Sequence, residues 1–395
     1  MAAQRKTSRY VVPVAVAGIA AATIGLVPAL AASGDPDLPE LTAQQLIEKI
    51  AASDTQTLSG TFKVSTDLGL PAFDGLLGGI AGGAAEGEGS ADPAEQLTKL
   101  VSGTHTLKIA ADGPERQKLT LLDGKEQYSL VHNGDEVWAY DSRSNEVFHE
   151  KGVDAGPEEG GPAHEKELPA SPKALADEVL KAAGDTTSIT VGGTANVAGR
   201  DAYRLVIEPK QEGSTVDAIT IAVDAATGTP LKFTLNSTSG GKPVLDAGFT
   251  KVDFGKPAAS EFDFTVPKGA KVTEGDKGAA GQKDLEKDLE KEFGGLGDLG
   301  LGGVGGLGEG DVNVIGEGWT TIARIDSGAP APKTDEAPKE VQGFLDSLGE
   351  KVSGKFGSGT VFKTKIVNAL MTDDGKVYVG AVTPDALVDA ANAAK

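Results

Sequence analysis

Between residues 116 and 148, apolar and polar residues alternate in short runs separated by turn dipeptides. Asp123-Gly124 and Asn133-Gly134 are such dipeptides, and a type I′ turn needs positive φ at both of its central residues. A period of two between turns of this kind is typical of antiparallel strands. The pattern therefore predicts four strands joined by tight turns.

Similar alternation returns after a Gly/Pro-rich acidic stretch and predicts a second group of strands. A helix is predicted earlier, where Thr42 and Gln45 have the spacing of a capping box and Leu46, Ile47 and Ile50 form one apolar stripe. A second helix is predicted from Ser171-Pro172 to Gly184, and a short one over 93–101. The further strands are expected near 57–68, 187–197, 201–209, 216–224, 230–238 and 244–254.

The C-terminal part has its own pattern of elements. Residues 273–310 combine a charged helical run with a glycine tract and are expected to form a linker. After them we expect a small α+β module over 311–395 with the order βαββα. Its predicted elements are strand 317–326, helix 338–349, strand 359–371, a hairpin at Asp374-Gly375, strand 376–382 and a helix from Pro384.

The first 31 residues have the features of a secretory leader. Arg5, Lys6 and Arg9 precede an apolar stretch from Val11 to Leu30 that ends in a small-x-small cleavage signal. We therefore expect an exported, extracytoplasmic protein, either secreted or in the cell envelope. The apolar stretch is also close to the ~20 residues that span a bilayer, so an uncleaved membrane anchor is the alternative.

Charge and cysteine content narrow the classes of partner. The net charge is −21, and the leader holds three positive and no negative residues, so its removal gives −24. An acidic chain of this kind repels nucleic acid and anionic headgroups. There is no cysteine, which excludes disulfides and a lipidated N-terminal cysteine.

Catalytic motifs are scarce. The chain has neither a Gly-x-Ser-x-Gly elbow nor a Walker A sequence, and it has no cysteine nucleophile. A formal dinucleotide fingerprint from Gly300 to Gly305 lies within a glycine tract, without a preceding strand or following helix. The four histidines lack metal-ligand spacing. We expect no enzyme, cofactor or metal, although a hydrolase with unrecognised carboxylates is a third alternative.

Apolar residues among glycines between 68 and 80 are the sharpest candidate for a binding feature. This segment either fills the core as a buried loop or forms a mobile lid over an apolar groove, with its glycines as hinges. Trp138 and Tyr140 carry the same two interpretations, as core residues or as lining of a cavity.

Several stretches together resemble a known family. They are LSGTFKV, DGKEQYSLVHNGDEVWAYDSRSNEV, AYRLVIEP with ITIAVDAATGTPLKFTL, and FDFTVPKGAKV. Over residues 38–272 the chain resembles the lipoprotein-carrier (LolA) and sigma-E regulator (RseB) superfamily, in a divergent actinobacterial form. The resemblance implies a strongly curved antiparallel sheet, an unclosed β-barrel, covered by helices and enclosing a cavity for acyl chains.

The resemblance also implies a function without catalysis. We expect an exported carrier of lipid or lipoprotein acyl chains under a helical or loop lid; the alternative is an envelope-stress regulator that binds another envelope protein, such as an anti-sigma factor ectodomain. Arg116 is the candidate lid latch. The expected acyl-binding residues are Phe62, Val64, Leu70, Phe73, Leu76, Leu77, Ile80, Leu107, Ile109, Trp138, Tyr140 and Phe233.

Overall fold

The computed structural model describes most of the chain outside the first 34 residues and four long internal stretches. The described residues are 35–69, 91, 103–152, 177, 180–181, 183–275, 312–326 and 349–394. Within them the protein is mostly β, with two sheets and the α-helices α2 (Ala43–Ala51) and α8 (Pro384–Ala393).

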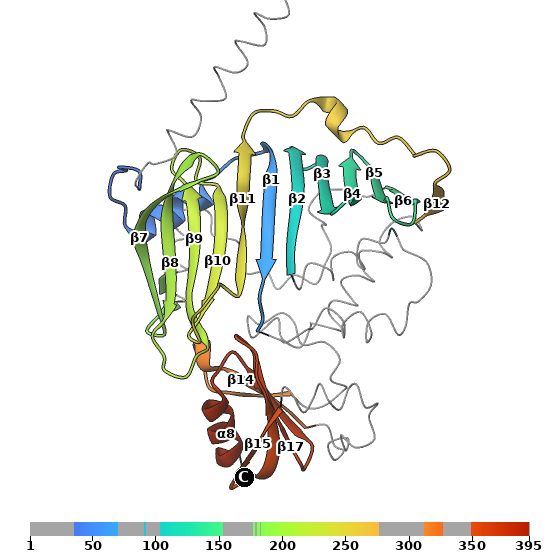
Figure 1. Ribbon diagram of the computed structural model, residues 1–395. Helices are drawn as coiled ribbons and strands as arrows, with labels where there is room; N and C mark the ends of the chain where they lie inside the picture. Colours follow the sequence, from blue (N-terminus) through green and yellow to red (C-terminus); the bar gives the residue numbers. More distant parts are fainter. Residues whose placement is uncertain are drawn as a thin grey trace, which may run out of the picture.

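The larger sheet has twelve strands, and β1 (Thr57–Thr66) lies inside it with β2 on one side and β11 on the other (Figure 1). Every pairing in this sheet is antiparallel except that of β12 with β6, so the sheet is mixed. Its other strands are β2 (Gly103–Asp112), β3 (Arg116–Asp123), β4 (Glu126–Asn133), β5 (Glu136–Asp141), β6 (Glu146–Lys151), β7 (Thr187–Val197), β8 (Arg200–Pro209), β9 (Val216–Asp224), β10 (Pro230–Ser237), β11 (Leu245–Asp253) and β12 (Lys271–Glu274).

The four strands predicted between 116 and 148 are present as β3 to β6, but the turn type was wrong. Asp123 pairs with Glu126, so the central turn residues are Gly124 and Lys125, one position later than predicted. Gly124 has φ 60° and Lys125 is not among the residues with positive φ. Positive φ at the first central residue alone is the geometry of a type II′ turn. In the turn after β4, Asn133 pairs with Glu136 and Gly134 has φ 66°, so it too has glycine at the first central position.

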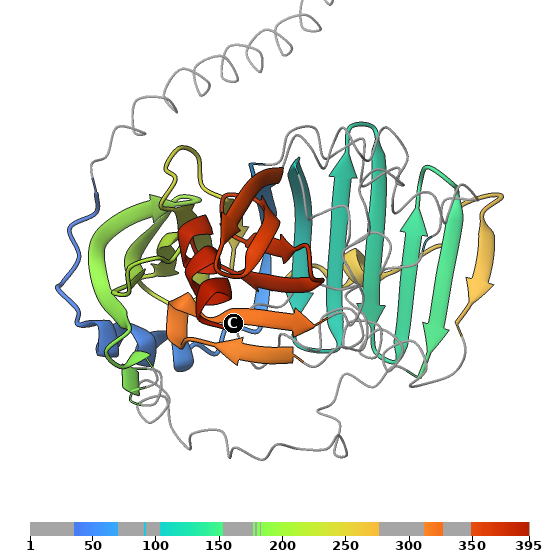
Figure 2. The ribbon, with the colours of Figure 1, turned by 90° about the horizontal axis from the view of Figure 1, so that it is seen from below.

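The sheet is neither closed nor strongly curled, which corrects the expected half-barrel. Figure 2 shows β3 to β6 lying side by side as a broad layer. Curvature is introduced by bulges and glycine kinks. The ladders from β2 to β6 run without a register shift, whereas shifts occur in β7, β10 and β11. The regular half of the sheet therefore stays open.

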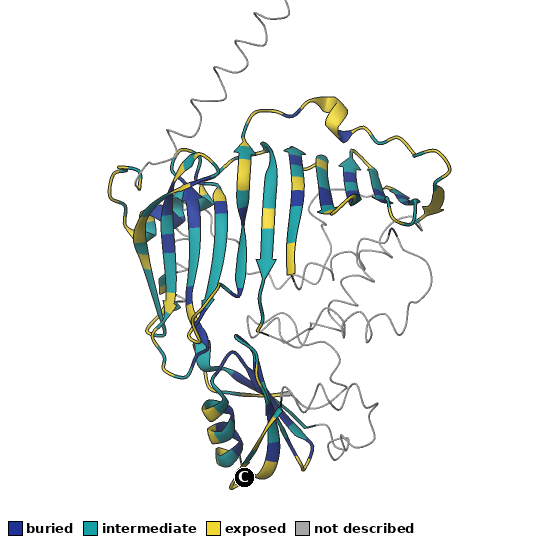
Figure 3. Ribbon diagram, viewed as in Figure 1, coloured by how far each residue is buried: buried dark blue, intermediate teal, exposed yellow. Residues whose placement is uncertain are grey.

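Helix α2 begins as the sequence predicts. The Thr42 side chain accepts a hydrogen bond from the Gln45 backbone N–H, and the Gln45 side chain accepts one from the Thr42 backbone. Leu46 and Ile47 are buried against Tyr203 and Leu205 of β8. The expected cover of the sheet by helices is therefore seen at this end only, among the described elements. Buried positions recur along β8 and β9 in Figure 3.

The C-terminal residues form a second, six-stranded antiparallel sheet with α8 against it. The single strand predicted over 359–371 is two strands in the structure. The predicted helix 338–349 lies outside the described residues except for Gly349, and Gly349 begins a strand. The strands are β13 (Val312–Ile315), β14 (Ile322–Asp326), β15 (Gly349–Gly354), β16 (Gly357–Phe362), β17 (Asn368–Thr372) and β18 (Lys376–Gly380).

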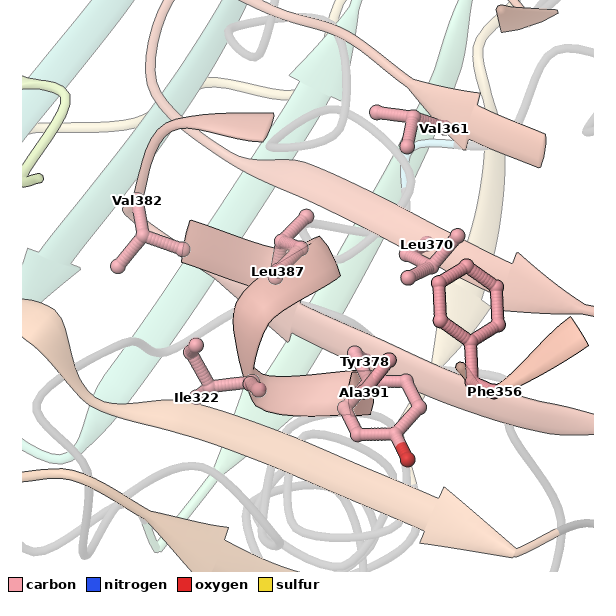
Figure 4. Packing of buried hydrophobic residues seen from close by; sticks show 9 residues of the cluster. Ile322, Phe356, Val361, Leu370, Tyr378, Val382, Leu387 and Ala391 are labelled. Carbon is pink, nitrogen blue, oxygen red and sulfur yellow. The ribbon is translucent and has the colours of Figure 1, made fainter. Parts of the chain in front are cut away.

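This C-terminal sheet has its own apolar core. Leu387 and Ala391 of α8 pack on Leu370 and Tyr378 of the sheet, with Phe356 at the rim (Figure 4). Leu387 and Leu370 are fully buried. The expected domain boundaries, including the 273–310 linker, stay a prediction.

The two sheets meet through hydrogen bonds and a shared apolar cluster. Ser214 forms an isolated bridge with Val382, and the Thr383 backbone N–H donates to the Gly213 carbonyl over 2.8 Å. Val216 of the large sheet packs in one cluster with Ile366 of the small one. At the end of β1, the Lys365 ammonium lies 2.7 Å from the Asp67 carboxylate. The C-terminal sheet is thus fixed to one end of the large sheet.

Candidate functional site

The register of β1 to β6 places a row of apolar side chains on one side of the sheet. Phe62 pairs with Leu107, which pairs with Leu121, which pairs with Tyr128. Directly paired residues of antiparallel strands point to the same side. We call this side the apolar face. Its residues are Phe62, Val64, Leu107, Ile109, Leu119, Leu121, Tyr128, Leu130, Ala139 and Phe148.

Burial is uneven across the apolar face. Leu107, Leu121, Tyr128 and Ala139 are at most 7% exposed, and the other members are half-buried. The Tyr128 hydroxyl donates to the Ala91 carbonyl over 3.2 Å. Ala91, itself buried, is the last residue of the glycine-rich insertion at 69–91. The chain therefore passes over the apolar face at the point where this insertion ends.

Four of the predicted acyl-binding residues lie together on this face: Phe62, Val64, Leu107 and Ile109. The Phe62 ring makes an edge-to-face contact with Phe249, with 5.0 Å between ring centroids. Phe233 is on the same side, because it pairs with Ala247, which pairs with Val64. Leu70, Phe73, Leu76, Leu77 and Ile80 lie outside the described residues.

Trp138 and Tyr140 are on the opposite side of the sheet. Ala139 between them pairs with Leu130 and Phe148 of the apolar face, so its two neighbours point the other way. The Trp138 ring is stacked between His149, at 3.5 Å between centroids, and Phe264, at 5.1 Å. The structure does not bring these two aromatic residues to the other predicted ligand-binding residues.

Ion pairs and hydrogen bonds surround the Trp138 stack. The Trp138 indole N–H donates to Glu136, which also pairs with Lys151 at 3.0 Å. Hydrogen bonds from Lys151 and Trp138 lower the pKa of the Glu136 carboxyl. His149, 3% exposed, lies with Nδ1 2.9 Å from Glu274 of β12. These contacts fasten β12 to the edge of the sheet.

Arg116, the candidate latch, is also on the side opposite to the apolar face. It alternates with Gln117, whose partners Ala111 and His132 belong to the apolar side. Its guanidinium lies 2.5 Å from the Asp112 carboxylate. This placement does not bring the guanidinium to the apolar face, and a latching role stays a prediction.

A set of lysines on the polar side was missed from the sequence. Lys63 and Lys108 are exposed and alternate with Phe62, Val64, Leu107 and Ile109. A single lysine between two apolar residues of a strand was a readable signal, because it must point to the side opposite to its apolar neighbours.

The described residues were compared with the needs of a metal site and of a membrane-spanning helix. Among them there is no group of three or more His, Cys, Asp or Glu side chains that could hold a metal ion. None of the helices in the described part has the length and hydrophobicity of a membrane-spanning helix. The arrangement is suited to contacts with apolar groups on one side and with polar groups on the other.

Comparison with known proteins gives fold likenesses at low identity. No family model matches the chain, and no curated protein matches it. A solved complex of MucA and MucB from Pseudomonas aeruginosa matches 88% of this chain and 96% of the other chain, at 14% identity and a TM-score of 0.35. MucB corresponds to RseB.

Two further solved structures match a smaller share of the chain. A LolA superfamily protein from Nitrosomonas europaea covers 57% of this chain and 99% of its own length, at 9% identity and a TM-score of 0.19. An uncharacterised conserved protein from Thermus thermophilus covers 59% and 98%, at 13% identity and a TM-score of 0.31. At these identities and TM-scores the likenesses assign no function to the chain.

Proposed function

We propose that the protein is a non-catalytic exported carrier that binds the acyl chains of a lipid or lipoprotein at the apolar face. The observation that supports this proposal is the cluster of apolar side chains that β1 to β6 place on one side of the sheet. Burial of each methylene of a ligand there contributes about 0.8 kcal/mol. The segment 68–80 is proposed as the lid, and all of it except Leu68 and Gly69 lies outside the described residues.

The length of the bound chain provides the test. Since 0.8 kcal/mol is about a fourfold change in affinity, each added methylene should strengthen binding of a saturated fatty acid about fourfold. The assay is displacement of a fluorescent fatty acid from the full mature chain. An affinity that does not depend on chain length, or a complete lack of uptake, would contradict the proposal.

Two adjacent residues of β2 give a matched pair of variants. Ile109 is half-buried on the apolar face, and Lys108 is exposed on the other side. Ile109→Gln should weaken fatty-acid binding by about tenfold, because it places an amide where apolar area is buried. Lys108→Gln, the control, should leave the affinity unchanged. Equal effects of the two substitutions would show that the ligand does not lie on the apolar face.

A second candidate function is regulation, in which ligand binding is reported to another envelope protein. Its support is the attachment of the C-terminal sheet to β1, the strand that carries Phe62 and Val64. Lys365 pairs with Asp67 at 2.7 Å, and its backbone N–H donates to the Leu68 carbonyl over 2.9 Å. The hydrogen bond from Lys365 lowers the pKa of the Asp67 carboxyl.

Hydrogen exchange separates the two candidates. For a regulator, fatty-acid binding should change the exchange of backbone amides around Lys365, and Lys365→Gln should remove that change. For a carrier without this coupling, the changes should stay within β1 to β6.

A further inference from the structure

Five neighbouring strands of the large sheet each carry one lysine on the same side, opposite to the apolar face. Thr61 of β1 pairs with Lys108 on one side and with Lys251 on the other. Lys63 follows two residues after Thr61 and pairs with Gly248, which pairs with Lys232 of β10. Lys118 follows by the same alternation, since Lys108 pairs with Thr120 of β3. We call this set of five lysines the lysine face.

The spacing of the lysine face follows from strand geometry. Strands β10, β11, β1, β2 and β3 stand side by side (Figure 1). Neighbouring strands are about 4.8 Å apart, and alternate residues of one strand are about 6.7 Å apart. The attachment points of Lys251 and Lys108, two strands apart, are therefore about 10 Å from one another, and Lys63 stands one step further along β1.

Only part of this positive charge is balanced within the described chain. Lys232 pairs with Asp246 at 2.9 Å, and Lys118 donates to the Glu261 backbone carbonyl over 3.0 Å. No ion pair within the described residues involves Lys63, Lys108 or Lys251, all three exposed. Such a cluster in a chain of net charge −21 points to an external anion.

We propose that the lysine face binds an acidic segment of another polypeptide in extended conformation. Alternate side chains of an extended segment are about 6.7 Å apart, which matches the step between successive lysine positions along the strands. Thr61 lies between Lys251 and Lys108, and Thr106 lies beside Lys63, so hydroxyl donors accompany the ammonium groups.

An anionic membrane is the less favoured occupant. The lysine face and the apolar face are the two sides of the same strands, so a membrane on the lysine face would turn the apolar face away from the bilayer. This inference goes beyond the proposed carrier function, and binding of an acidic peptide would stand even if fatty acids did not bind.

The test compares two triple variants of the full mature chain. Lys63, Lys108 and Lys251 are changed to Gln in one variant. In the control, three exposed lysines outside this face, Lys242, Lys268 and Lys351, are changed to Gln, which removes the same charge. The probe is a fluorescent glutamate-rich peptide followed by anisotropy, with phosphatidylglycerol vesicles in a parallel sedimentation assay.

We expect the peptide to bind the wild-type chain and the control variant with similar affinity, and the lysine-face variant at least about tenfold more weakly. Binding to the wild-type chain and to the control variant should weaken as the salt concentration rises. Circular dichroism should show both variants folded, because all six lysines are exposed. Absence of peptide binding would overturn the proposal, as would equal binding by the two variants. Vesicle binding that is lost in the lysine-face variant without peptide binding would assign the face to a membrane instead.

Discussion

Removal of the Asp224 carboxylate should destabilise the large sheet by about 3 kcal/mol. Asp224 ends β9, and its side chain is 1% exposed. It accepts two hydrogen bonds from Arg200, at 2.7 and 3.0 Å. It also accepts from the backbone N–H groups of Ala226 and Thr227 and from the Thr227 hydroxyl. This carboxylate therefore holds both an arginine and the β9–β10 turn.

The magnitude follows from what each substitution leaves unpaired. Asp224→Ala leaves the guanidinium and two turn amides without their acceptor, and breaking a buried pair costs about 3–5 kcal/mol. Arg200 is about one-third exposed, and water screens part of the loss, so the lower end applies. Asp224→Asn keeps one acceptor oxygen and should lose about 1–2 kcal/mol.

The pH dependence has a definite sign. Burial by itself raises the pKa of Asp224, but the hydrogen bonds from Arg200 and Thr227 outweigh burial and lower it below its ordinary value. A folded pKa below the unfolded one gives stability that is complete above the unfolded pKa, about 3.9, and is lost as pH falls through the folded pKa. The stability difference between wild type and Asp224→Asn should therefore shrink below about pH 4.

Urea unfolding at pH 7 and at lower pH measures these differences, with Asp201→Ala as the control. Asp201 is an exposed carboxylate next to Arg200 and should contribute less than about 0.5 kcal/mol. An Asp224→Ala variant within about 0.5 kcal/mol of wild type would refute the reasoning, because a carboxylate with five hydrogen bonds would then contribute no more than a surface residue.

Three further predictions concern packing and turns. Gly228 has φ +77°, and an added Cβ would lie 2.3 Å from the Lys49 carbonyl oxygen. Gly228→Ala should therefore lower the free energy of unfolding by about 2 kcal/mol, measured by urea unfolding. An unchanged urea midpoint would contradict this contact. Leu387 is fully buried, so Leu387→Ala should lower the stability of the C-terminal sheet by about 2–5 kcal/mol. The loss should appear as faster exchange of backbone amides in β16 to β18. Unchanged exchange would argue against the apolar core of this sheet. Trp319→Phe removes the 2.8 Å hydrogen bond that the indole N–H donates to the Thr187 hydroxyl. Because this bond joins the two sheets, its loss should lower stability by about 1 kcal/mol. Calorimetry should show a lower melting temperature for the C-terminal sheet.

Local features were predictable from the sequence because their causes are local. The capping box of Thr42 and Gln45 needs only residues within one turn of helix, and the structure has both of its hydrogen bonds. Strands β3 to β6 follow from alternation between turn dipeptides. The turns themselves were misplaced by one residue, because Asp-Gly fits a type I′ turn but here glycine occupies the first central position of a type II′ turn.

The arrangement of the two faces required long-range information. Trp138 and Ala139 alternate, and the sequence left Trp138 open as a core residue or as the lining of a cavity. The structure instead places Ala139, which is fully buried, among the apolar residues and stacks Trp138 between His149 and Phe264. Phe264 lies 126 positions after Trp138 in the chain, so no local sequence pattern connects the two rings.

The position of β1 between β2 and β11 has a consequence for how the protein assembles. Ser59 pairs with Asp253, so one edge of β1 has no partner until almost the whole large sheet has been synthesised. Pairing of residues so distant in sequence is slow, because closing a long loop is entropically costly before any contact forms. Until then the strand offers a free hydrogen-bonding edge that can join other chains. We expect newly synthesised chains to depend on a holding chaperone, or on rapid docking of β11, to escape aggregation.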